Sequence, residues 1–172
     1  MLATYPDRET FFKAFTPDKQ IRMQEDVDKC FFGDAPSLSM LNATYGRQTA
    51  AMWLIPQLYN LSEYCGCRDK LQGTPLKECA SIIASEFWYL TVTEIMLFFV
   101  RFKSGRYGRF YGSVDPFVIM TALRSFLEER AAAIERHNDE QREQVSAEWR
   151  KDAMSWEDYC MAKYGRLKEL GE

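Results

Sequence analysis

The feature that most constrains the fold is a helix-start signal that the sequence repeats three times. A capping residue stands directly before a proline at Thr16-Pro17, Thr74-Pro75 and Asp115-Pro116. A capping side chain accepts hydrogen bonds from free N–H groups in the first helical turn, and proline suits the first helical position. Apolar residues recur near a 3.6-residue period between these signals, without strand alternation of useful length. The sequence therefore predicts an all-α, bundle-like domain of roughly six to eight helices.

Three further signals concern the N-terminal half. Asp7 is expected to cap a short helix. The helix that starts at Thr16 is expected to run on to a left-handed C-terminal cap at Gly33. Pro56 lies inside the helical pattern of residues 47–64 and should kink or divide that helix.

Two more concern the centre of the chain. Thr91 with Glu94 three residues later fits a capping box, which would start a strongly apolar, central helix. The glycine- and tyrosine-rich residues 107–113 form a possible small hairpin.

The C-terminal third suggests an extension beyond the core. After Pro116 apolar residues first recur at helical spacing and then become sparse, and residues 135–144 (ERHNDEQREQ) contain no large apolar side chain. We expect a helical core domain at residues 1–134 and a projecting helical extension at 135–172, linker-like over 135–144 and amphipathic afterwards. Ser155 with Asp158 predicts a fresh helix start within this extension.

Composition narrows the class of protein. The formal net charge is −3 and hydrophobic residues make up 47 % of the chain, which favours a packed core over a chain coated in nucleic acid. The longest apolar window, residues 87–100, is shorter than the roughly 20 residues needed to span a bilayer. We expect a cytosolic protein without membrane partners.

No catalytic motif is visible. The sequence lacks a phosphate-binding loop, a dinucleotide-binding glycine pattern, a zinc-protease motif and a nucleophile elbow. Its single histidine, His137, lies in the charged stretch, and Cys65 and Cys67 are the only close pair among five cysteines. Zinc sites usually need four ligands. We therefore expect no metal, no cofactor and no enzyme activity, with an enzyme of unknown class as a distant alternative.

Residues 101–112, the basic turn, concentrate positive charge and aromatic rings without any acidic residue. Such groups hold phosphates and stack on bases, so the turn is a candidate nucleic-acid site. The alternative is structural: cations favour the last turn of a helix, and the aromatics can seal a tight turn between buried helices. The candidate residues are Arg101, Lys103, Arg106, Tyr107, Arg109 and Tyr111.

The C-terminal extension carries a second candidate site. Trp149, Trp156 and Tyr159 follow the polar stretch, and exposed Trp and Tyr on a terminal helix commonly mark a surface for a protein partner. The alternative is that this helix folds back on the core. Homo-oligomerisation is a further possibility.

Residues 76–130 resemble small uncharacterised helical proteins of bacterial mobile elements and phages, of the Bacteroidetes type. The resemblance rests on Glu94, on Phe98-Phe99, on KSGRYG and FYG between 103 and 112, on Asp115-Pro116 and on Arg130. It implies an accessory of replication or DNA processing. We therefore expect a non-enzymatic adaptor that works through macromolecular contacts, with direct DNA or RNA binding by the basic turn as the alternative.

Overall fold

The computed structural model describes residues 1–165, and it confirms the all-α fold class. No strand occurs in this part of the chain; the β-type pairing consists of isolated bridges. The α-helices and the 3-10 helix η1 that precede residue 116 are α1 (Arg8–Ala14), η1 (Pro17–Gln24), α2 (Val27–Phe32), α3 (Leu38–Tyr45), α4 (Thr49–Tyr64), α5 (Gly73–Glu86) and α6 (Val92–Lys103). They are followed by α7 (Pro116–Asp152), α8 (Trp156–Cys160) and a short π-helix, η2 (Met161–Gly165).

The chain divides into two compact units, residues 1–131 and 132–172, of which 166–172 lie outside the described residues. The first unit holds the hydrophobic core, whose buried apolar side chains run from Phe11 to Phe126. Beyond Phe126 no described residue is buried. Folding of the first unit therefore rests on side chains that the unit itself contains.

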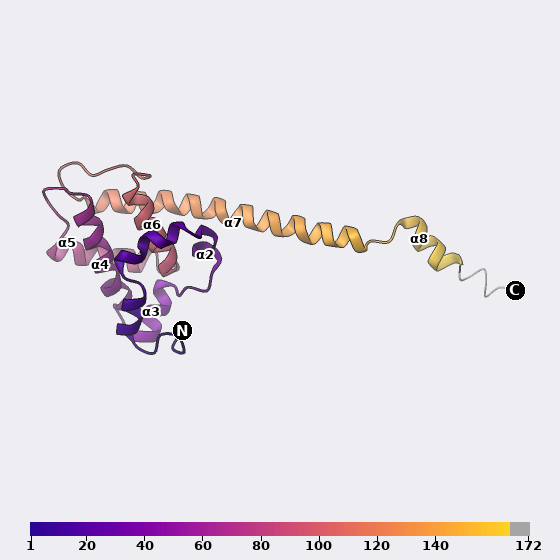
Figure 1. The fold of residues 1–172 in the computed structure, drawn as a ribbon, viewed down its shortest axis with the longest axis horizontal. Helices are drawn as coiled ribbons and strands as arrows, with labels where there is room; N and C mark the ends of the chain where they lie inside the picture. The colour runs from indigo at the N-terminus through magenta and orange to yellow at the C-terminus, as the bar shows by residue number, and fades with distance from the viewer. Residues whose placement is uncertain (166–172) are drawn as a thin grey trace. The chain divides into compact units, whose positions relative to one another are not determined.

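Helix α6 is the centre of the first unit, as its apolar sequence predicted. It packs against η1, α2 and α4 (Figure 1), and nine of its twelve residues are buried. The predicted capping box is present: the Thr91 hydroxyl accepts from the Glu94 N–H at 3.2 Å, and the Glu94 carboxylate accepts from the Thr91 N–H at 2.8 Å. The box fixes where this buried helix begins.

Three other predicted starts are also confirmed. Asp7 caps α1, and its carboxylate accepts from the Thr10 N–H at 2.8 Å. Pro116 is the first residue of α7, and Ser155 caps α8. By contrast, α5 begins at Gly73, so Thr74 lies inside the helix rather than at its cap.

The single helix expected from Thr16 to Gly33 is wrong. The Asp26 carboxylate accepts from the Lys29 N–H at 2.9 Å and starts α2 as a separate helix after η1. An Asp side chain competes in this way with continued helix. Gly33 has φ −82°, so it is not a left-handed cap.

Pro56 neither divides nor ends α4, which runs continuously through it. Pro56 is exposed, while Trp53, Leu54, Gln57 and Leu58 around it are buried. Water can therefore bond the carbonyl that proline leaves without a partner, and the packed face holds the helix together.

The polar residues 135–144, predicted to be linker-like, are part of the continuous helix α7. They contain neither glycine nor proline and are rich in Glu, Gln and Arg, which favour helix intrinsically. Contacts between successive turns add support, including an ion pair between Arg142 and Asp139 at 3.6 Å.

The hairpin proposed for residues 107–113 does not form. Its pairing is reduced to single bridges from Ser113 to Tyr111 and to Asp69. Gly108 and Gly112 have φ of 97° and 79°, so the backbone turns too often for two strands to pair.

Candidate functional site

The basic turn begins where α6 ends. The Ser104 N–H still reaches the Val100 carbonyl at 3.0 Å, but Gly105 takes φ 84°, a conformation that glycine adopts without strain. The Arg106 N–H then returns to the Arg101 carbonyl at 3.2 Å. The chain is thus reversed within a few residues, and the four basic side chains leave it in different directions.

The carboxylate of Glu129 on α7 forms ion pairs with two of these four basic side chains. Its two oxygens accept from Arg101 Nη1 and from Arg106 Nε, each at 2.7 Å, and the Tyr107 hydroxyl donates to it at 3.3 Å. The Arg101 guanidinium also lies 5.6 Å from the centre of the Phe31 ring. Arg101 and Arg106 are therefore engaged inside the first unit.

Tyr107 is half-buried rather than open to a base. Its ring stacks on Phe98 with centroids 5.6 Å apart, and burial, followed by the charge of Glu129, raises its pKa to about 12. Its aromatic face and its hydroxyl are both occupied. These contacts agree with the alternative in which Tyr107 helps to seal the turn between buried helices.

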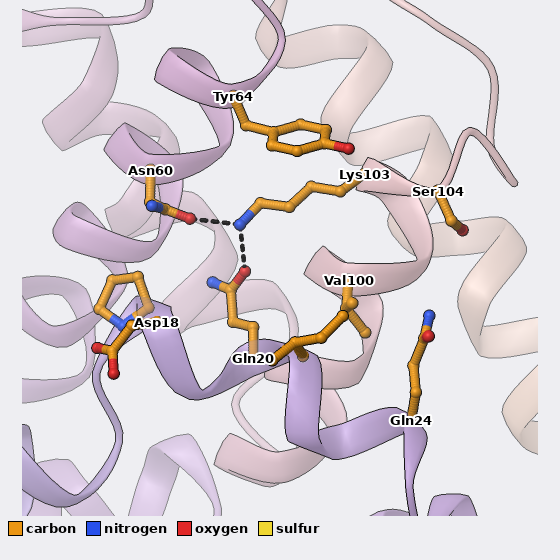
Figure 2. A pocket seen from close by; sticks show the side chains of 10 residues that line it. Asp18, Gln20, Gln24, Asn60, Tyr64, Val100, Lys103 and Ser104 are labelled. Carbon is orange, nitrogen blue, oxygen red and sulfur yellow. Dashed lines mark hydrogen bonds between the residues drawn. The ribbon is translucent and has the colours of Figure 1, made fainter.

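Lys103 points to the other side of α6 from Arg101, since residues two apart on a helix lie roughly 200° around the axis. Its ammonium donates to the side-chain oxygens of Gln20, at 2.7 Å, and of Asn60 (Figure 2). The Tyr64 ring centre lies 5.5 Å from Nζ. Burial lowers the pKa of Lys103, and the Cys65 thiol partly opposes that shift.

Gln20, one of the two amide side chains that meet Lys103, belongs to a longer chain of hydrogen bonds. Gln20 donates to Gln57 at 2.6 Å, and Gln57 donates to the Phe15 carbonyl at 2.8 Å. Both glutamines are buried. This network fixes the side of α6 that faces η1 and α4.

Arg109 and Tyr111 differ from the rest of the turn. Both are exposed, Tyr111 by 84 %, and the structure gives Arg109 no ion pair among the described residues. Arg109 lines a cavity of about 260 Å³ together with Lys103, Gly105 and Gly108. Arg106 is exposed as well, by 53 %, but it pairs with Glu129.

The six predicted nucleic-acid residues therefore do not form one surface. Arg101, Arg106 and Tyr107 meet at Glu129, whereas Lys103 lines the cavity that Arg109 also lines and a second cavity beside Gln20 and Asn60. Their role in binding stays a prediction.

The aromatic segment, residues 145–161 of the second unit, presents large exposed side chains. Trp149 is 76 % exposed and Trp156 is 74 % exposed. Tyr159 is 40 % exposed and stacks on Trp156 with centroids 5.5 Å apart. The three predicted partner-binding residues lie on two helices, Trp149 in α7 and the stacked pair in α8.

No cluster of three or more His, Cys, Asp or Glu side chains in the described part of the chain can hold a metal ion. The cysteines are free thiols. Cys30 and Cys79 are buried, and desolvation raises the pKa of each to about 11, so both are neutral near physiological pH. Neither has the character of an activated nucleophile.

Sequence reasoning missed Gln20, Asn60 and Glu129. Gln20 lies 83 residues from Lys103, Asn60 lies 43 residues from it, and Glu129 lies 28 residues from Arg101. Each is an ordinary polar residue in a helical pattern, without a local motif. Only the packing of η1, α4 and α7 around α6 reveals them.

A comparison with protein families finds a match over residues 70–171, more than half of the chain, to DUF6633, a family of unknown function. The protein belongs to DUF6633. The matched region contains the basic turn and the aromatic segment, and it leaves out Gln20 and Asn60. No curated protein and no solved structure matches the chain. Within the described residues, no helix combines the length and apolarity that crossing a membrane requires.

Proposed function

We propose that this DUF6633 protein is a non-enzymatic adaptor that binds a protein partner through its aromatic segment. The observation that carries the proposal is the exposure of Trp149 and Trp156 beyond a core whose last buried side chain is Phe126. Trp and Tyr dominate the energetics of protein interfaces. Covering one such side chain contributes roughly 2–3 kcal/mol.

The extent of the family match supports this assignment. It reaches residue 171 and so includes the aromatic segment, although that segment contributes no buried side chain to the core. A stretch that only filled space after the core would have no physical need for two exposed tryptophans. Docking to a protein partner is a physical reason for these two tryptophans to be exposed.

The setting follows from the resemblance of residues 76–130. We propose that the partner belongs to the replication or DNA-processing machinery of a mobile element, and that the adaptor acts in the cytosol.

A capture experiment tests the adaptor role. Immobilised full-length protein is incubated with lysate from the source organism beside a Trp149→Ala/Trp156→Ala variant. A Trp88→Ala variant is the matched control, because Trp88 is also exposed, by 55 %, but lies in the first unit. We expect a nuclease-resistant protein partner that the control retains and the double variant loses. Equal capture by all three would contradict the proposal.

Direct nucleic-acid binding has support from Arg109 and Tyr111, the exposed cation and ring of the basic turn. An Arg109→Glu/Tyr111→Ala variant tests it more cleanly than changes at Lys103 or Arg106, which have partners inside the first unit. If the turn binds nucleic acid, the unmodified protein should bind single-stranded DNA with an affinity that falls with salt, and the variant should show a shallower dependence. Salt-independent affinity, or none, would leave the turn a structural element.

A further inference from the structure

A cavity of about 340 Å³ lies beside Lys103, among residues from η1, α4 and α6 (Figure 2). Ile21, Val100 and the Tyr64 ring give it an apolar part. Gln20 and Asn60 give it a polar part next to the Lys103 ammonium. A volume of this size suits a small organic group.

Lys103 is half-buried in this cavity without a counter-ion among the described residues. Its hydrogen-bond acceptors, Gln20 and Asn60, are neutral amide oxygens. Asp18 also lines the cavity, but in Figure 2 its carboxylate points away from Lys103, and the Thr16 hydroxyl holds it. Arg101 and Arg106, by contrast, both reach a carboxylate.

This arrangement leaves one hydrogen-bond donor of the Lys103 ammonium without an acceptor among the described residues. An ammonium carries three N–H donors, and two of them are used by Gln20 and Asn60. Partial burial of a charge without a counter-ion is unfavourable, which is the reason that the pKa of Lys103 is lowered. An anion that enters the cavity would complete both the hydrogen bonding and the charge balance.

We propose that the Lys103 cavity binds a carboxylate carried on a short apolar chain. A single ammonium matches a monoanion, and Ile21 and Val100 suit an aliphatic chain. A phosphate dianion normally recruits Arg, and no arginine is among the residues that line this cavity. The site is separate from the aromatic segment and does not depend on the adaptor role.

The carboxylate can come from a free acid or from the C-terminus of a peptide. We would titrate full-length protein by calorimetry with 4-methylpentanoate and with an N-acetylated tetrapeptide that ends in a free leucine carboxylate. The matched controls are 4-methylpentanamide and the same peptide as its C-terminal amide. We expect at least one acid to bind about tenfold more tightly than its amide, the effect of about 1.4 kcal/mol. Whichever acid binds identifies the source.

Two variants test the role of Lys103 itself. Lys103→Met removes the cation, and Asn60→Asp places a carboxylate of the protein next to it. Both should weaken binding of the acid about tenfold, to the affinity of its amide, and Asn60→Asp should also raise the melting temperature, which separates lost binding from lost folding. Lys70→Met is the control, because Lys70 pairs with Glu63 on the surface at 2.6 Å, and it should bind as the unmodified protein does.

The proposal is overturned by equal affinity for acid and amide, or by the absence of binding for both acids. It is also overturned if inorganic phosphate binds in their place, or if Asn60→Asp keeps its affinity while remaining folded.

Discussion

The buried ion pair between Glu94 and Arg130 supports the sharpest quantitative prediction. Arg130 Nε lies 2.5 Å from Glu94 Oε1, and the side chains are 27 % and 1 % exposed. The other carboxylate oxygen closes the capping box at Thr91. Arg130→Met keeps much of the apolar stem but leaves the Glu94 carboxylate buried without its cation.

Removing one partner of a buried pair costs 3–5 kcal/mol, and the partial exposure of Arg130 places this case near the lower end, at about 3 kcal/mol. For a chain of this length, a loss of that size lowers the melting temperature by roughly 6–12 °C. A Glu94→Gln/Arg130→Met double variant removes the stranded charge, and Gln also suits the capping box. We expect it to lie only about 1 kcal/mol below the unmodified protein.

Urea denaturation measures these differences as shifts of the midpoint at constant slope. Arg124→Met is the matched control, because Arg124 pairs with Glu86 at 3.8 Å and both side chains are more than half exposed; it should cost less than about 0.5 kcal/mol. The reasoning fails if Arg130→Met costs no more than this control, or if the double variant is no more stable than Arg130→Met alone.

Three further outcomes are expected. A chain that ends after Arg136 should still melt cooperatively, only slightly below the full-length protein, because the buried core lies upstream; a molten fragment in circular dichroism would contradict this. Glu129→Ala should cost about 2 kcal/mol in urea denaturation by stranding Arg101, whose side chain is 13 % exposed; a change below that of a surface pair would refute it. A thiol reagent at mildly alkaline pH should label at most three of the five cysteines until the protein unfolds, because burial and a pKa of about 11 keep Cys30 and Cys79 protonated; five native labels would show that the core is open.

Local signals accounted for much of the helical framework. The capping box at Thr91, the cap at Asp7 and the starts at Pro116 and Ser155 were readable because each depends on residues at most three positions apart. The central position of α6 was readable because a helix that is apolar nearly all round must be buried. These features follow from short-range geometry.

Competition between neighbouring signals was harder to read. The side chain of Asp26 split the helix expected from Thr16 to Gly33, and the packed face of α4 carried that helix through Pro56. In the first case a local cap outweighed a continuous apolar pattern. In the second, burial of the residues around Pro56 outweighed the missing hydrogen bond.

The sequence by itself determined that the chain is helical, where four of its described helices begin, and that positive charge gathers at residues 101–112. Only the tertiary structure decided what each charge meets. Glu129 lies on α7, and Gln20 and Asn60 lie on η1 and α4. The hydrogen-bond partners of Arg101 and Lys103 therefore come from helices that are distant in sequence. Helix propensity is set within a few residues, whereas the partner of a side chain is set by how helices pack, and no local pattern encodes that.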